Sequence, residues 1–172
     1  MIFKSVDSIL EPDPRFTNLC VVENGVARRM TLADHHAALA GISLVDLVPE
    51  DVQAAFNRAR NATLYAFFDY DLFVVGEMQA FGALEMALKR RLNGSGSASR
   101  GTLRKLIGRA RNAGVLPPLV SGANALLDPI EALIELRNEL SHGTSDIHSP
   151  GMALQVIETC ASWINHVCSS GR

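Results

Sequence analysis

The sequence predicts an all-α fold, an antiparallel bundle of four to five helices preceded by a small N-terminal β-hairpin and arm. From residue 49 onward, apolar residues recur at steps of three and four along several segments, which is the spacing of one helix face. Aromatic residues make up only 6% of the chain, so Leu, Val, Ile and Ala must fill the core, which favours helices over stacked sheets. The length of 172 residues and the hydrophobic content of 48% suit one domain with a short appendage.

Residues 1–48 are predicted to be the appendage, consisting of an arm, a hairpin and a short helix. Two prolines interrupt the arm. Asn24 and Gly25 stand between two short apolar runs and supply the two positive-φ positions of a type I′ turn, which predicts a hairpin. Thr31 can then cap a short helix that ends at Ala40.

Residues 49–172 are predicted to form the bundle. A proline followed by two acidic residues, at positions 49 to 51, is typical of a helix start. A linker of small polar residues, Asn93–Ser99, separates the second long helix from the third. The expected helices cover about residues 50–67, 73–92, 100–113, 127–142 and 151–168.

The composition argues against several classes of protein. Three cysteines without a Cys-x-x-Cys pair indicate neither a zinc site nor a disulfide framework. The first ten residues lack the apolar run of a signal peptide, and no stretch approaches the roughly 20 apolar residues that span a bilayer. We therefore expect a cytoplasmic protein that does not enter a membrane.

No cofactor and no metal are expected. Adjacent side chains on a helix diverge by about 100°, so Asp34, His35 and His36 are interpreted as a surface helix cap and not as a set of metal ligands. The Asn93-Gly94-Ser95-Gly96 segment lacks the strand and the lysine of a phosphate-binding loop.

The segment from Glu135 to Gly143 carries the most informative pattern. Arg137 falls on the apolar face of its helix, where a guanidinium is costly unless an anionic group meets it. Asn138 and His142 share the opposite, polar face, which also holds two glutamates, Glu131 and Glu135.

These three residues supply the parts for RNA cleavage without a metal. Arg137 can hold a phosphate or stabilise charge on it, and Asn138 can orient the imidazole or donate to a phosphate oxygen. His142 can be the general acid or base, because a helix C-terminus and the nearby Glu139 favour the imidazolium form. Glu139 and Ser141 are taken as supporting residues. The alternative is that arginine and histidine form a surface salt bridge and cap the last carbonyls of the helix.

A second feature points to RNA. No acidic residue stands between Glu85 and Asp128, although this interval holds eight of the 16 basic residues. Such a polarised distribution can attract a phosphate backbone, but it is equally the pattern of a solvated helix face that pairs with acidic helices elsewhere. The basic residues are Lys89, Arg90, Arg91, Arg100, Arg104, Lys105, Arg109 and Arg111.

The Leu-Arg-Asn-Glu-Leu-Ser-His-Gly segment resembles the signature of the HEPN superfamily, with the matches at Arg137, Asn138 and His142. The Met78–Lys89 segment, with its Ala-Leu-Glu core, resembles an earlier helix of that family, and the likeness extends over roughly residues 50–168. Glu85 is an inward carboxylate on that earlier helix. We expect it to support the site, or to be a structural partner of Arg137.

The resemblance implies a helical homodimer in which the two motif helices meet in one cleft. Many members of the superfamily are ribonucleases, often toxins restrained by a partner. The first hypothesis is therefore a metal-independent HEPN endoribonuclease that yields 2′,3′-cyclic phosphate ends and belongs to a toxin–antitoxin or defence system, with an antitoxin or nucleotidyltransferase as partner. The alternative is a non-catalytic HEPN module that binds RNA, a nucleotide or a partner protein.

Overall fold

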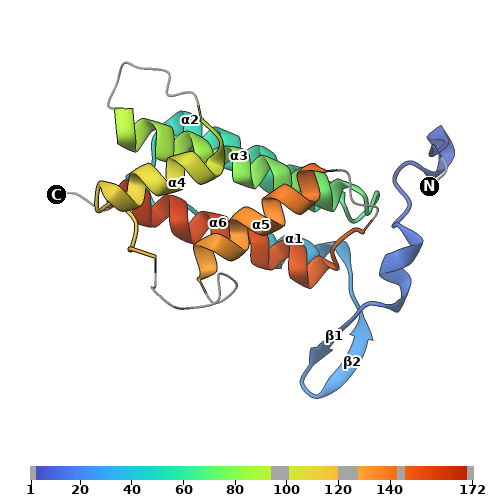
Figure 1. The fold of residues 1–172 in the computed structure, drawn as a ribbon. Coiled ribbons are helices and arrows are strands. Elements are labelled where there is room, and N and C mark those ends of the chain that lie inside the picture. Colours follow the sequence, from blue (N-terminus) through green and yellow to red (C-terminus); the bar gives the residue numbers. More distant parts are fainter. Residues whose placement is uncertain (1–2, 94–100, 120–127, 143–145, 170–172) are drawn as a thin grey trace.

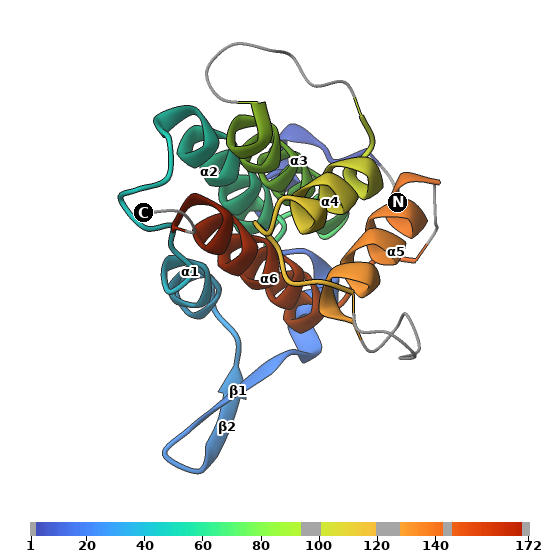
Figure 2. The same cartoon turned by 60° about the vertical axis from the view of Figure 1, so that its left-hand side comes forward.

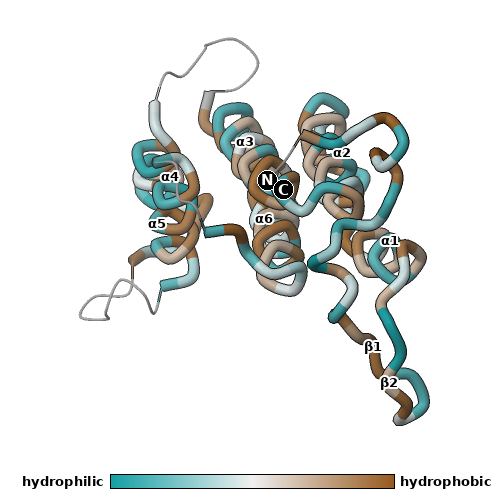
Figure 3. The backbone as a smooth tube through the Cα atoms, turned by 90° about the vertical axis from the view of Figure 1, so that its right-hand side faces the viewer, coloured by the Kyte–Doolittle hydropathy of each residue, from teal (hydrophilic) through white to brown (hydrophobic). Residues whose placement is uncertain are grey.

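A computed structural model describes residues 3–93, 101–119, 128–142 and 146–169, and this part of the chain folds into six α-helices and one two-stranded hairpin (Figure 1). The helices form three layers, with α3 and α6 in the middle, α2 and α1 on one side, and α4 and α5 on the other (Figure 3). The predicted all-α class with an N-terminal hairpin is confirmed. The helices are α1 (Leu32–Ala40), α2 (Glu50–Tyr65), α3 (Leu72–Asn93), α4 (Leu103–Asn112), α5 (Pro129–Ser141) and α6 (Pro150–Ser169).

Helix α3 is the central element, and it packs most extensively against α2 and α6. Its inward apolar side chains, among them Phe81, Leu84 and Leu88, are almost completely withdrawn from water, as the recurrence at three- and four-residue steps predicts. Helix α2 starts with Glu50 and Asp51 in its first turn, as predicted, where carboxylates interact favourably with the positive end of the helix dipole. The main core includes Val52, Phe56, Phe81, Leu84, Leu88, Leu106, Ile134, Ile157 and Ile164.

Helix α6 differs from its predicted packing at one position. The three- and four-residue spacing predicts an inner face made of Met152, Val156, Cys160, Trp163 and Val167. Val156, Cys160 and Val167 are buried, but Met152 is 51% exposed. Met152 lies in the first turn of α6 and lines a surface pocket there. The periodicity identifies the inner face of a helix, whereas the depth of burial depends on the neighbouring elements.

Helices α2 and α3 approach each other closely at Gly76. A Cβ atom at this position would lie 3.1 Å from the backbone nitrogen of Thr63 and 3.2 Å from the carbonyl oxygen of Ala59, and it would also meet the Thr63 hydroxyl. That hydroxyl donates to the Ala59 carbonyl oxygen at 2.9 Å. Two helices can approach this closely only where one of them lacks a side chain.

Gly76→Ala is expected to lower the free energy of unfolding by about 1–3 kcal/mol, because the added methyl group must push the two helices apart. Gly82→Ala is the matched control on the same helix, since nothing lies within 4 Å of a Cβ atom there. It should raise stability by about 1 kcal/mol through helix propensity alone. Urea denaturation of both variants measures the difference, and equal stabilities would contradict the close approach.

The N-terminal hairpin has the predicted turn. Strands β1 (Cys20–Glu23) and β2 (Val26–Arg29) pair antiparallel with Cys20 opposite Arg29. Asn24 and Gly25 have φ values of 52° and 80°, the positive region that a type I′ turn requires. The hairpin projects away from the helices (Figures 1 and 2).

The arm that precedes the hairpin contains two 3₁₀ turns, η1 (Val6–Ser8) and η2 (Pro14–Asn18). It is attached to the bundle through Phe16, which is 3% exposed and packs among the rings of Phe67, Tyr70 and Phe73. The segment predicted as an appendage therefore shares a second apolar cluster with the corner between α2 and α3.

His35, which was expected on the surface, packs against the aromatic rings of this cluster. Thr31 and Asp34 form the predicted cap of α1 as a reciprocal capping box, and His36 is exposed. His35 instead is 1% exposed, and its Nε2 lies 2.8 Å from the Thr63 carbonyl oxygen. A ring centroid distance of 5.7 Å from Phe16 links it to the arm. The surface assignment of His35 was wrong because the arm covers that side of α1.

The attachment of the arm is expected to weaken in acid, in two steps. Burial lowers the pKa of His35 below its ordinary value of 6.5, so the stability this neutral ring contributes is lost as pH falls below about 6.5, where the unfolded chain takes up a proton. Burial of Asp13 alone would raise its pKa, but hydrogen bonds from Arg15 and Tyr70 lower it to about 2. Its contribution is lost as pH falls from about 3.8 towards 2.

Urea midpoints of the wild type and of His35→Phe, measured between about pH 7.5 and pH 5, test the first step. The wild-type midpoint should fall over this range more than that of His35→Phe, which has no proton to gain at this site. Equal pH dependence in the two proteins would show that His35 does not cause the loss.

Candidate functional site

The predicted motif lies at the C-terminal end of α5. Asp128 starts this helix by accepting hydrogen bonds from the backbone nitrogens of Ile130 and Glu131, with Pro129 in the first turn. The helix runs from Pro129 to Ser141. It begins two residues after the predicted start and ends one residue before the predicted end. The predicted stop, Gly143, lies outside the described residues.

Arg137 meets the carboxylate that the sequence suggested. Its Nη2 lies 3.6 Å from Glu85 Oε1 on α3, and the two side chains are 29% and 18% exposed. Lys89 approaches the other oxygen of Glu85, also at 3.6 Å. The half-buried guanidinium on the seam between α3 and α5 therefore has an anionic partner, as its position on the apolar face requires.

The other motif residues lie around the end of the helix. His142 is exposed, and its backbone N–H donates to the carbonyl oxygens of Asn138 and Glu139. Asn138 is half-buried and Glu139 is exposed. The Ser141 hydroxyl donates to the Arg137 carbonyl oxygen at 2.6 Å, so it serves its own helix.

The two principal residues do not converge within one chain. Arg137 faces α3, and five residues further on His142 lies roughly 140° around the helix axis and about 7.5 Å along it. The two side chains therefore leave α5 on different sides. A composite site would need a second copy of the helix.

Several basic residues of the acid-free interval are paired with carboxylates in the part of the chain that the structure describes. Lys89 contacts Glu85, Arg90 contacts Asp51, and the pairs of Arg104 and Arg111 reach across to α5. Arg91, Lys105 and Arg109 have exposed side chains on α3 and α4, and Arg100 lies outside the described residues. Neighbouring acidic residues therefore reduce much of the local positive field.

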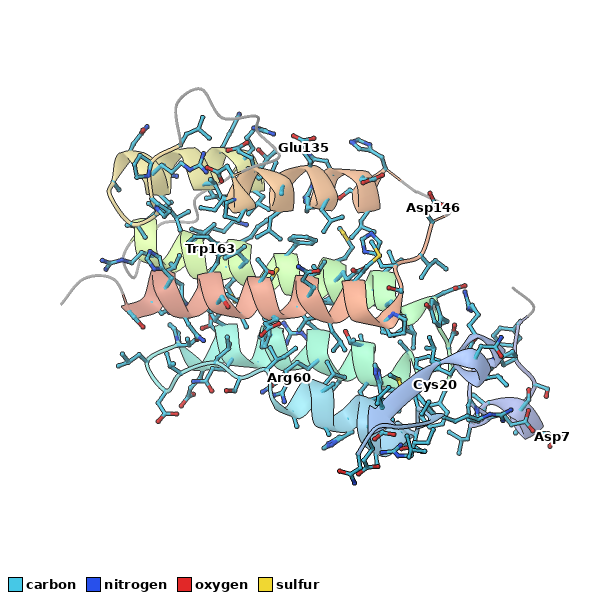
Figure 4. All side chains as sticks on the ribbon, turned by 90° about the horizontal axis from the view of Figure 1, so that it is seen from below. Asp7, Cys20, Arg60, Glu135, Asp146 and Trp163 are labelled. Carbon is cyan, nitrogen blue, oxygen red and sulfur yellow. The ribbon has the colours of Figure 1, made fainter. Side chains whose placement is uncertain are left out.

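Helix α4 is joined to α5 by a buried ionic cluster. Arg111 donates from Nη2 to both oxygens of Asp128 at 2.9 Å and from Nη1 to Glu131 at 2.7 Å, and its side chain is only 11% exposed. Arg104 donates to Glu131 at 2.9 Å and to Glu135 at 2.6 Å. Glu135 lies on the outer face of α5 (Figure 4). The polar face of α5 thus binds α4 along its first half and carries Asn138 and His142 in its last turns.

The sequence did not indicate a buried pair of a carboxylate and an imidazole near the motif. Glu77, on α3, is 0% exposed, and its Oε1 lies 2.6 Å from Nδ1 of His148, just before α6. The two residues are 71 positions apart, and His148 stands alone in the sequence, so no local spacing could indicate the contact. His148 also lines a pocket between α5 and α6.

In the described ranges, no group of three or more His, Cys, Asp or Glu side chains is arranged to hold a metal ion. The helices of this described part are all too short or too polar to cross a membrane. Comparison of the chain with protein-family models, with curated proteins and with solved structures finds no match.

Proposed function

We propose that the protein is a metal-independent endoribonuclease of the HEPN type that acts as a homodimer. The observation that carries the proposal is the pairing of Arg137 with Glu85 beside a helix end that presents His142 to solvent. A cation on an apolar seam and an exposed imidazole one to two turns apart are the two groups that cleavage of a phosphodiester without metal requires.

The reaction would be an attack of the RNA 2′-hydroxyl on the adjacent phosphorus. His142 would accept the proton of that hydroxyl or deliver a proton to the departing 5′-oxygen. Arg137 would stabilise the negative charge that grows on the phosphate oxygens, and Asn138 would orient the imidazole or the phosphate. The P–O5′ bond breaks as the P–O2′ bond forms, which leaves a 2′,3′-cyclic phosphate and a 5′-hydroxyl.

A dimer supports this chemistry because the motif residues diverge on a single helix. In a two-fold interface the same surface of both subunits meets, so two copies of the end of α5 would face each other. Arg137 of one subunit would then lie opposite the exposed helix end of the other. The ion pair with Glu85 at 3.6 Å leaves guanidinium N–H groups that a phosphate could engage.

The test is to incubate the purified full chain with end-labelled single-stranded RNA in EDTA. The proposal expects cleavage, with products that carry 2′,3′-cyclic phosphate ends and resist 3′-end ligation until the ring is opened and the resulting phosphate is removed. Loss of cleavage in EDTA with recovery on adding Mg²⁺ would refute the metal-independent mechanism. Size-exclusion chromatography with light scattering, on the same preparation, reports the dimer.

A non-catalytic module that binds RNA, a nucleotide or a partner protein is the second candidate. Within this candidate, the ion pairs of Lys89, Arg90, Arg104 and Arg111 favour a partner protein over RNA, because cations already matched by carboxylates attract a phosphate backbone less strongly. Retention of RNA on a filter without any cleavage, decreasing steeply with salt, would indicate an RNA-binding module. No retention at all would favour a protein or nucleotide partner.

A further inference from the structure

A buried carboxylate and an imidazole form a hydrogen-bonded pair apart from the motif on α5. Glu77 has no exposed surface, and its Oε1 receives the hydrogen bond from Nδ1 of His148 at 2.6 Å. The second oxygen, Oε2, has no hydrogen-bond partner among the described residues. A carboxylate so far from water is costly unless a positive charge accompanies it.

A protonated His148 would supply that charge. Burial raises the pKa of Glu77, and the hydrogen bond and positive charge of His148 act against this effect. A carboxylate paired with an imidazolium carries no net charge. Burial therefore costs less free energy for this pair than for either ion alone. In this form Nδ1–H is used by Glu77, and Nε2–H remains available to another acceptor.

The ring of His148 is 15% exposed and forms part of the wall of a pocket of about 260 Å³. The pocket lies between α5 and α6, and apolar side chains such as Leu133, Leu136 and Val156 make up most of its wall. Gln155 supplies a second polar group at the pocket, with an amide that can donate. A mostly apolar cavity with few polar groups is the usual form of a site for a small molecule.

We propose that this pocket binds a small monocarboxylate with an apolar body, independently of the ribonuclease site. The ligand carboxylate would accept a hydrogen bond from Nε2 of His148, and its hydrocarbon part would lie against Leu133, Leu136 and Val156. A carboxylate is favoured over an alcohol because a hydrogen bond between two charged groups is about twice as strong as one between neutral groups. An amine is disfavoured because it would bring a second donor to a donor.

Isothermal titration calorimetry of the full chain with hexanoate, hexan-1-ol and hexylamine tests this assignment. Hexanoate should bind at least about 10-fold more tightly than hexan-1-ol, and hexylamine should bind least. Equal binding of all three would show an unspecific apolar surface, and preferential binding of hexylamine would show that the pair presents negative charge. Either result, or no binding of hexanoate, would overturn the proposal.

Three variants locate the binding. Glu77→Gln keeps an acceptor for Nδ1–H but removes the negative charge, so it should weaken hexanoate at least about 10-fold and leave hexan-1-ol unchanged. Ala132→Leu reduces the volume of the pocket and keeps Glu77 and His148 as they are in the sequence. It should abolish binding of both compounds. His36→Ala, at an exposed histidine on α1, should have no effect. Unchanged hexanoate binding in Ala132→Leu, with the fold verified by circular dichroism, would place the ligand elsewhere.

Discussion

His142→Ala is expected to slow RNA cleavage by about 10²–10⁴-fold, the contribution that a positioned general acid or base typically makes. The side chain is exposed at the end of α5, where it makes no buried contact, so its removal should not alter the stability of the protein. Cleavage of a labelled RNA under single-turnover conditions measures the loss. The shape of the pH–rate profile should change with it, because the general acid or base is removed.

His36→Ala is the matched control, since His36 is also an exposed helical histidine but lies on α1, in the outer layer opposite α5. It should cleave RNA at the wild-type rate. If His142→Ala retains full activity while the control behaves normally, the ribonuclease mechanism assigned to this motif is wrong. If both variants lose activity equally, the measured cleavage comes from a contaminating nuclease or from a general effect of the substitution.

Arg137→Ala should cause a loss of about 10²–10³-fold in the same assay, as expected when a preorganised donor to the reacting phosphate is removed. Arg137→Lys keeps the charge and the ion pair with Glu85 but lacks the planar fork, so it should recover only part of the activity. Full activity in the lysine variant would reduce the role of Arg137 to that of a charge that ties α5 to α3.

Arg111→Met is expected to lower the free energy of unfolding by about 3–5 kcal/mol, the usual cost of removing one partner from a buried ionic cluster. Asp128 would lose both of its guanidinium contacts, and Glu131 would lose one. These carboxylates are nearly buried, so water cannot replace the lost hydrogen bonds. Urea denaturation followed by circular dichroism gives the change in stability.

Arg104→Met provides the comparison on the same helix. Its side chain is 54% exposed, and exposed ion pairs contribute about 1 kcal/mol or less. A similar loss of stability in the two variants would mean that burial of the arginine does not determine the loss. The contacts between α4 and α5 would then depend only on the number of opposite charges. A small loss in Arg111→Met would show that Asp128 and Glu131 find other partners.

The ion pairs of Arg111 also bear on the interpretation of the basic interval. The absence of acidic residues between Glu85 and Asp128 suggested either an RNA-binding field or a face paired with acidic helices. For Arg104 and Arg111 the structure has the second arrangement, with carboxylates from α5. The carboxylates that neutralise these cations lie just outside the interval from Glu85 to Asp128 or at its end. A count of acidic residues within the interval therefore leaves them out.

The local structure of this protein follows from neighbouring residues along the chain. Asn24 and Gly25 specified the type I′ turn, Thr31 with Asp34 specified the cap of α1, and the apolar periodicity specified the inner faces of the helices. These features depend on residues within about four positions of each other, because backbone hydrogen bonds and helix faces have that reach. The partnership of Arg137 with Glu85 could also be suggested, since an arginine on an apolar face requires an anion on the helix that it meets.

Contacts between residues far apart in the sequence depend instead on how the helices pack. His35 is buried because the arm places Phe16 over it, and Glu77 finds His148 because α3 and the start of α6 adjoin in the middle layer. The rotation of each helix about its axis and the order of the layers set these contacts. Both follow from how all side chains fill the core together, a global property of packing that no local spacing along the chain contains.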